Sequence, residues 1–138
     1  MLTPDQSAFV LAQRVAHLAT VGADGEPHVI PVCFAWVEGC FWIAIDEKPK
    51  RSADLKRLRN IAANPRVSLL FDRYDDDWSR LAYVLVHGTA KVIASGRSET
   101  GALAALRERY AQYKGMGLEE RPLVLVRVER VVAWGAVT

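Results

Sequence analysis

Hydrophobic and polar positions alternate over several short runs of this chain, and turn residues separate the runs, which is typical of half-buried β-strands. Residues 15–21 and 28–36 (VAHLATV and HVIPVCFAW) flank a turn at 23–25, and FWIAID at 41–46 follows a second turn at 38–39. Strands joined by such tight turns run antiparallel, because parallel strands need a long crossover. The first part of the chain is therefore predicted to form a three-stranded meander.

Strand composition returns in three later stretches, at residues 66–72, 80–95 and 122–137. Gly88 interrupts the second of them, and a glycine inside a strand is typical of a bulge or a bend. We therefore expect two or three strands from the first two stretches and one strand from the last.

Helical signals begin the chain and return before its last strand. Residues 3–6 (TPDQ) form a capping box with proline at the first helical position, which predicts a short helix to about residue 14. A second helix is predicted between Ser98, as N-cap, and Gly115, as its end. Its apolar face has residues at spacings of three and four: Leu103, Leu106, Tyr110 and Tyr113. So many antiparallel strands with so few helices favour a small closed barrel over a βαβ sheet.

Length and composition predict one folded domain over residues 1–138. The chain is long enough for a single core, and 51% hydrophobic with 25% charged residues argues against disorder. The first residues lack a basic segment followed by an apolar block, and no apolar run approaches the ~20 residues that a membrane span requires. We expect a cytoplasmic protein with no membrane association.

The two cysteines, Cys33 and Cys40, are not expected to form a disulfide. If Val37 faces Cys40 across the turn at 38–39, Cys33 faces Ala44 instead. They are interpreted as small apolar residues rather than redox or metal groups. No metal-ligand spacing relates them to the three histidines, so we expect no metal site.

Positive charge is concentrated in residues 48–66 (KPKRSADLKRLRNIAANPR), which hold seven of the eighteen Lys and Arg residues and one acid, Asp54. From Ser52 to residues 64–65, apolar residues at helical spacing predict a helix of about three turns. Its expected apolar side consists of Leu55, Leu58, Ile61 and Ala62. Its expected polar side consists of Lys56, Arg59 and Asn60, with Arg57 near the edge. If Ser52 caps this helix, its first amides and the preceding loop both attract anions.

Three interpretations of this basic segment stay open on the residues alone. It could be a solvated helix face, a nucleic-acid contact, or a site for a compact anionic ligand. The rest of the chain is net acidic, and DRYDDDW at residues 72–78 would repel a polyanion nearby. A phosphorylated cofactor fits a single local patch better than nucleic acid does, so we expect no nucleic-acid partner.

Several stretches in this order resemble the pyridoxamine-phosphate-oxidase-like flavin and deazaflavin proteins, and within them the probable F420-dependent subgroup. The resemblance lies in AHLATVGADGEPHVIPVCF, FWIAI, LKRLRNIAANPRVSLLFD and WSRLAYVLVHGTAKVI, with RVERVVAWG near the end. It implies a mainly β fold with flanking helices, a split β-barrel of six or seven antiparallel strands. It also implies a homodimer with cofactor sites at the subunit interface.

The resemblance assigns cofactor contacts to particular residues. In such proteins a basic pair ahead of the helix-ending Asn-Pro holds the cofactor phosphate, and here that pair is Lys56 and Arg57. The flavin-like ring lies along the strand after the first hairpin, which contains Ile30, Pro31 and Val32. Pro31 cannot donate to a ladder, so it predicts an edge or an opening of the sheet, with or without a ligand.

Three further residues are assigned to the same site because the loop before the basic helix is longer than in shorter members of the family. F420 carries a phosphodiester and several carboxylates beyond the single phosphate of FMN, and Lys50, Arg51 and Ser52 suit that longer anion. Each exposed pairing contributes only ~0.2 to 1 kcal/mol, so several must act together, and Lys48 is left unassigned. Trp78 is interpreted either as a wall of the pocket, including that of a neighbouring subunit, or as a staple over local core.

The expected activity is hydride transfer between coenzyme F420 and a small organic substrate, with FMN in the same pocket as the alternative cofactor. The protein would supply orientation and electrostatics. A protein that binds the cofactor without turnover is the alternative from another class. No catalytic residue is assigned; the side chains able to donate a proton are His28, Tyr74, Tyr83 and His87, and a structural role is the alternative for each.

Overall fold

The computed structural model describes residues 1–45 and 55–138. In these ranges the helices are α1 (Pro4–Ala12), α2 (Lys56–Ala63) and α3 (Thr100–Arg109). The strands are β1 (Ala16–Val21), β2 (Pro27–Val32), β3 (Ala35–Val37), β4 (Cys40–Ala44), β5 (Arg66–Arg73), β6 (Ala82–Ile93) and β7 (Leu123–Gly135).

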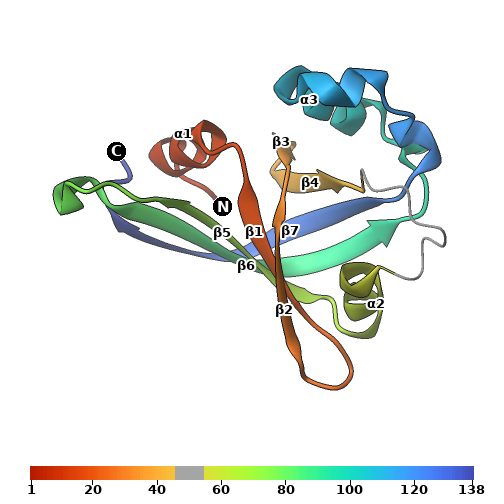
Figure 1. The fold of residues 1–138 in the computed structure, drawn as a ribbon, viewed down its shortest axis with the longest axis horizontal. Coiled ribbons are helices and arrows are strands. Elements are labelled where there is room, and N and C mark those ends of the chain that lie inside the picture. The colour runs from red at the N-terminus through yellow and green to blue at the C-terminus, as the bar shows by residue number, and fades with distance from the viewer. Residues whose placement is uncertain (46–54) are drawn as a thin grey trace.

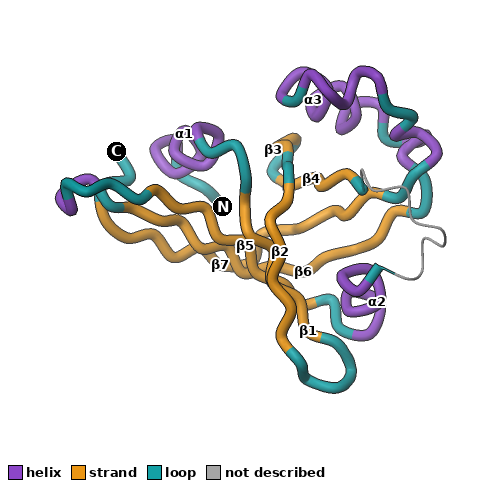
Figure 2. Tube along the Cα trace, in the orientation of Figure 1, coloured by secondary structure: helices purple, strands orange, loops and turns teal. Residues whose placement is uncertain are grey.

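All seven strands belong to one antiparallel sheet in the order β2-β1-β5-β6-β7-β4-β3. The sheet curls into a half-barrel, with α2 beside β1 and β6 and α3 beside β3 and β4 (Figures 1 and 2). The predicted split β-barrel is confirmed. The fully closed barrel expected from the tight hairpins is wrong, because β2 and β3 form the edges of the sheet in the described residues.

One face of the curled sheet forms the core. Buried positions alternate with partly exposed ones along β1 and β6, as the period of two requires. Three fully buried aromatic rings, those of Phe34, Phe41 and Phe71, meet at the centre of this core with centroids 5.0 to 5.9 Å apart. The opposite face of the central strands is therefore free to carry a site.

The capping box at the start of α1 is confirmed, since the Gln6 N–H donates to Thr3 Oγ1 and the Gln6 side chain accepts from the Thr3 N–H. The predicted starts of the other two helices are wrong. α2 begins at Lys56 after the N-cap Leu55, and α3 begins at Thr100 after the N-cap Glu99. Neither N-cap side chain makes a hydrogen bond to its helix, so these two helices start without the side-chain capping that was expected.

The bulge predicted at Gly88 is present as a register shift between β6 and β7. His87 pairs with Arg130 and Gly88 with Val128, so Glu129 is the extra residue on β7. The predicted three-stranded meander is wrong. The chain leaves the ladder between β2 and β3, and the hairpins β1–β2 and β3–β4 lie at opposite edges of the sheet. Val37 faces Cys40 as expected, and both cysteines are free.

Candidate functional site

The basic helix α2 packs against the β1–β2 hairpin. Lys56 is its first residue, and the Lys56 Nζ lies 4.0 Å from Asp24 Oδ2 in the hairpin turn. The Glu26 backbone N–H, which donates to Asp24 Oδ1, lowers the pKa of the Asp24 carboxyl, and the charge of Lys56 lowers it further. Arg57 is only 8% exposed, although it was expected near the edge of the polar side. Three further residues were assigned to the cofactor from the sequence. They lie outside the described residues: Lys50, Arg51 and Ser52.

Asn60 faces the core side of α2, so its assignment to the polar side was wrong. It is 2% exposed, and its Nδ2 donates to Thr20 Oγ1 on β1 at 3.0 Å. A Cβ added at Gly22 would lie 2.5 Å from Asn60 Oδ1, which shows how closely the hairpin approaches this side chain. Ala62, expected on the apolar side, is exposed. A buried amide with a partner on another element thus holds α2 against β1.

Replacing Asn60 by Ala is expected to lower the free energy of unfolding by about 1 to 3 kcal/mol, because the Thr20 hydroxyl loses its buried donor. Urea unfolding of the Asn60→Ala and Thr20→Val variants and of the double variant measures the coupling between the two residues. Additive effects in this cycle would contradict a direct Asn60–Thr20 hydrogen bond as the link between α2 and β1.

The residues of β2 assigned to the cofactor ring lie at an edge of the sheet. Pro31 is exposed and pairs with His17, which confirms the edge predicted from this proline. Ile30 packs against the core and Val32 is 8% exposed, so their side chains point away from the outer face. Contact between these two residues and a ring on the outer face would therefore involve their backbone.

Trp78 is 73% exposed and belongs to a short 3-10 helix, Trp78–Arg80, between β5 and β6. This connection lies at the end of the sheet opposite α2 (Figure 1). One copy of the chain therefore does not bring Trp78 to Lys56 and Arg57. The assignment of Trp78 to the pocket of a neighbouring subunit stays a prediction.

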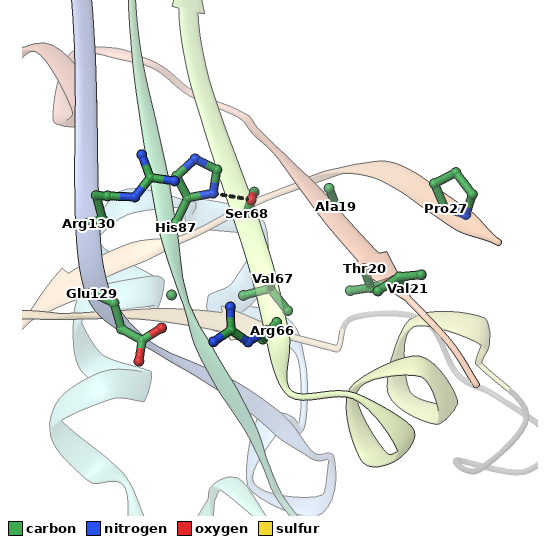
Figure 3. Close-up of a pocket in the computed structure, with 11 residues that line it drawn as sticks. Ala19, Thr20, Val21, Pro27, Arg66, Val67, Ser68, His87, Glu129 and Arg130 are labelled. Carbon is green, nitrogen blue, oxygen red and sulfur yellow. Dashed lines mark hydrogen bonds between the residues drawn. The ribbon is translucent and has the colours of Figure 1, made fainter. Parts of the chain in front are cut away.

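A pocket of about 360 Å³ opens on the outer face of the sheet, across β1, β2, β5, β6 and β7 (Figure 3). Its polar lining consists of Thr20, Arg66, Ser68, His87, Glu129 and Arg130. Thr20 also accepts the hydrogen bond from Asn60, and its buried side chain is on the same face of β1 as Leu18, so α2 packs on the core side of β1. The cationic helix and the pocket both adjoin β1, and the residues that line the pocket come from the strands and not from α2.

Strand register brings the polar groups of the pocket together. Ser68 and His87 face each other across β5 and β6, and Ser68 Oγ lies 2.9 Å from His87 Nδ1. The bulge at Gly88 places two consecutive residues of β7, Glu129 and Arg130, in the lining. Arg66 adds a second guanidinium from the start of β5.

Of these pocket residues, His87 alone had been considered for chemistry from the sequence. Arg66, Ser68, Glu129 and Arg130 were missed. For β5 a signal existed, since Arg66 and Ser68 alternate with the buried residues Val67 and Leu69 and so had to share the outer face. For β7 no such signal existed, because the bulge changes which residues face outward.

Comparison with known proteins gives the family. A family model described as pyridoxamine 5'-phosphate oxidase matches residues 2–135. The chain belongs to the pyridoxamine 5'-phosphate oxidase family. This confirms the resemblance found in the sequence. The family binds flavin.

The chain is similar to a curated protein, the 5a,11a-dehydrotetracycline/5a,11a-dehydrooxytetracycline reductase of Streptomyces rimosus. The two are 30% identical, over 96% of this chain and 82% of the reductase. This similarity supports oxidoreductase activity.

Solved structures share the fold. An F420 reductase is 23% identical with a TM-score of 0.66, over 96% of this chain and 98% of that chain. The heme storage protein HutZ of Vibrio cholerae is 18% identical with a TM-score of 0.73, over 97% of this chain and 94% of that chain. At these identities the comparisons carry the fold alone.

Two further properties concern the part of the chain that the structure describes. None of its helices is long and apolar enough to cross a membrane. It also has no group of three or more His, Cys, Asp or Glu residues placed to hold a metal ion.

The cations of the candidate site fit the anionic part of the cofactors that the pyridoxamine 5'-phosphate oxidase family uses. Lys56 on α2 and Arg66 on β5 keep at least part of their side chains in solvent, where a phosphate can reach them.

Proposed function

We propose that the chain is an F420-dependent oxidoreductase that transfers a hydride between the coenzyme and a small organic substrate. The observation that carries the proposal is the pocket of about 360 Å³, lined by Arg66 and Arg130, in a member of this family whose cationic helix α2 packs on the pocket strands β1 and β6. The reductase relative supports the reaction class, and the F420 reductase of the same fold supports the choice of cofactor.

Within this proposal, Lys56, Arg57 and Arg66 bind the negative groups of the cofactor. Lys50, Arg51 and Ser52 are proposed to extend that contact along the longer F420 tail. The exposed Pro31 and the backbone beside it at Ile30 and Val32 border the ring, which supplies the hydride when it is bound.

The substrate is proposed to lie over the outer face of β5, β6 and β7, where guanidinium groups meet a small polar surface. Arg66 and Arg130 favour a substrate with a carbonyl or another oxygen on which negative charge develops during reduction. Ala19 and Val21 supply apolar lining next to these groups. An unsaturated ketone or a quinone has this combination of a planar apolar body and a polar oxygen.

We propose that the active form is a homodimer with cofactor sites at the interface. Large apolar side chains lie on the outer face of the sheet: Val29 is 60% exposed, and Trp134, which stacks on Tyr83, is 52% exposed. A second copy would cover this face. Its Trp78 would then reach the site of the first copy, whose own Trp78 lies at the other end of the sheet. The cytoplasmic location expected from the sequence and the absence of a nucleic-acid partner stay predictions.

Titration of the protein with F420 and with FMN, followed by fluorescence, tests the cofactor. We expect F420 to bind more tightly than FMN. The reduced complex should then pass its hydride to at least one of cyclohexenone, menadione and 5a,11a-dehydrotetracycline, as measured by oxidation of the cofactor. Tighter binding of FMN, with turnover, would replace F420 by flavin as the cofactor.

A binding protein without turnover is the second candidate, and the imidazole of His87 in the pocket is the observation that favours it. Heme is a candidate ligand for such a protein, because a solved structure of the same fold is that of a heme storage protein. Heme titration followed by absorption tests this candidate. Tight binding of heme or F420 with no oxidation of reduced cofactor by any of the three substrates would favour it over the oxidoreductase.

A further inference from the structure

The imidazole of His87 lines the pocket with one of its ring nitrogens already engaged. Ser68 Oγ lies 2.9 Å from His87 Nδ1, and the two residues are direct cross-strand partners on β5 and β6. No other hydrogen bond reaches the His87 ring from the residues that the structure describes. Nε2 is therefore the ring nitrogen available to a molecule in the pocket.

Serine suits a ring that changes its protonation state. Its hydroxyl oxygen can accept a hydrogen bond from Nδ1–H of an imidazolium, and it can accept the same bond from the neutral ring that remains after Nε2 has lost its proton. The Ser68 contact can thus hold the ring in place before and after the loss of a proton from Nε2.

We propose that His87 is a catalytic proton donor in the reduction, a role that rests on the proposed function. An unsaturated carbonyl substrate in the pocket would accept at its β-carbon the hydride that a bound reduced deazaflavin or flavin would supply, which forms a C–H bond and breaks the C=C π bond. The electron pair of that bond moves toward the carbonyl oxygen as an enolate. The Nε2–H bond of His87 breaks, its proton passes to the enolate, and the imidazole regains a proton from water. The substrate gains two electrons and two hydrogens in all, and the cofactor is oxidised.

The charged groups around His87 suit a developing enolate. Arg130 is its cross-strand partner on β7, Arg66 lies on β5, and both line the same pocket. Glu129, the bulge residue of β7, is the single carboxylate in the described lining and offsets part of this positive charge. On β1 the lining next to Ser68 is Ala19, and His17 stands two residues before it on the same face.

The His87→Gln variant keeps an amide donor in place of the ring but cannot transfer a proton. We expect it to bind the cofactor as the wild type does, to reduce substrate at least tenfold more slowly, and to change the pH profile of the reduction. The Ser68→Ala variant should slow reduction less, and Ser68→Thr, which restores a hydroxyl, should recover it. Lys91→Gln, on the same strand and outside the pocket lining, is the matched control and should change neither rate nor pH profile.

A second measurement needs no turnover. 4-Nitrophenol is a planar mimic of the enolate whose absorption distinguishes phenol from phenolate. We expect wild-type protein to bind it at least tenfold more tightly than His87→Gln does, and the imidazole ¹⁵N signals of His87 to shift on binding.

An unchanged rate and pH profile in His87→Gln overturn the proton-donor role. If no substrate is turned over by wild type, the proposed function fails, and equal binding of 4-nitrophenol to the two proteins then overturns the role of His87 as well.

Discussion

Replacing Gly88 by Ala is expected to destabilise the protein by about 2 to 3 kcal/mol and to disturb the pocket. A Cβ at this position would lie 2.2 Å from the backbone oxygen of Arg127 and 3.2 Å from a side-chain carbon of Val126. Carbon and oxygen cannot approach so closely, and a backbone carbonyl inside a ladder cannot rotate away without losing its register. The larger Gly88→Val substitution should be worse still.

The same glycine connects the fold to the site. The register shift at Gly88 makes Glu129 the extra residue and sets Arg130 opposite His87. If a side chain at 88 forces β6 and β7 apart, these groups leave the positions that they have in the pocket. We therefore expect Gly88→Ala to weaken binding of 4-nitrophenol as well as to lower the midpoint of urea unfolding.

Gly101→Ala is the matched control for this prediction. Gly101 lies inside α3, and a Cβ there would meet no atom within 4 Å. Because alanine favours a helix over glycine, this substitution should stabilise the protein by about 0.5 to 1 kcal/mol. Two glycine-to-alanine changes with opposite signs separate steric overlap from a general effect of losing glycine. Equal stability of Gly88→Ala and wild type would contradict the tight approach of β6 to β7.

The strands could be predicted from the sequence because their signals are local. Alternation of apolar residues located β1, β5, β6 and β7, and the turn at Glu38 and Gly39, both with positive φ, fixed the pairing of Val37 with Cys40. The capping box of α1 is local in the same sense. Each of these features depends on residues a few positions apart.

The features that the sequence did not predict depend on contacts between distant segments. Asn60 looked like a surface residue because its partner Thr20 is 40 residues away in the sequence. The pocket draws Ser68, His87 and Arg130 from three strands, and the bulge decides which residues of β7 join them. Periodicity states which face of a strand is apolar, but it does not state where two strands shift against each other.

Replacing Lys56 and Arg57 together by Ala is expected to lower the affinity for F420 at least tenfold, which is ~1.4 kcal/mol. Both residues open α2 beside the β1–β2 turn, where phosphate would meet a lysine that is 35% exposed and the first amides of the helix. Fluorescence titration of the variant measures the affinity. The difference in affinity between wild type and the double variant should shrink as the salt concentration rises, because salt screens the charge contacts that only the wild type makes.

The burial of Arg57 makes single variants necessary. Arg57 is 8% exposed, so its removal can also loosen the packing of α2, whereas Lys56→Ala removes a charge at the surface. We expect Lys56→Ala alone to keep the unfolding midpoint of wild type and still to weaken F420 binding. Arg59→Ala, at an exposed position of the same helix, should change the affinity less than twofold.

Asp24→Asn tests the same contact in the opposite direction. The Asp24 carboxylate lies 4.0 Å from Lys56 Nζ and competes with a phosphate for that ammonium group. Its neutralisation should leave Lys56 with more unbalanced charge and raise the affinity for F420. Because the turn around Asp24 also uses the carboxylate to accept the Glu26 N–H, an amide oxygen at the same place keeps that hydrogen bond. Unchanged affinity in both Asp24→Asn and the double variant would move the phosphate of the cofactor away from the start of α2.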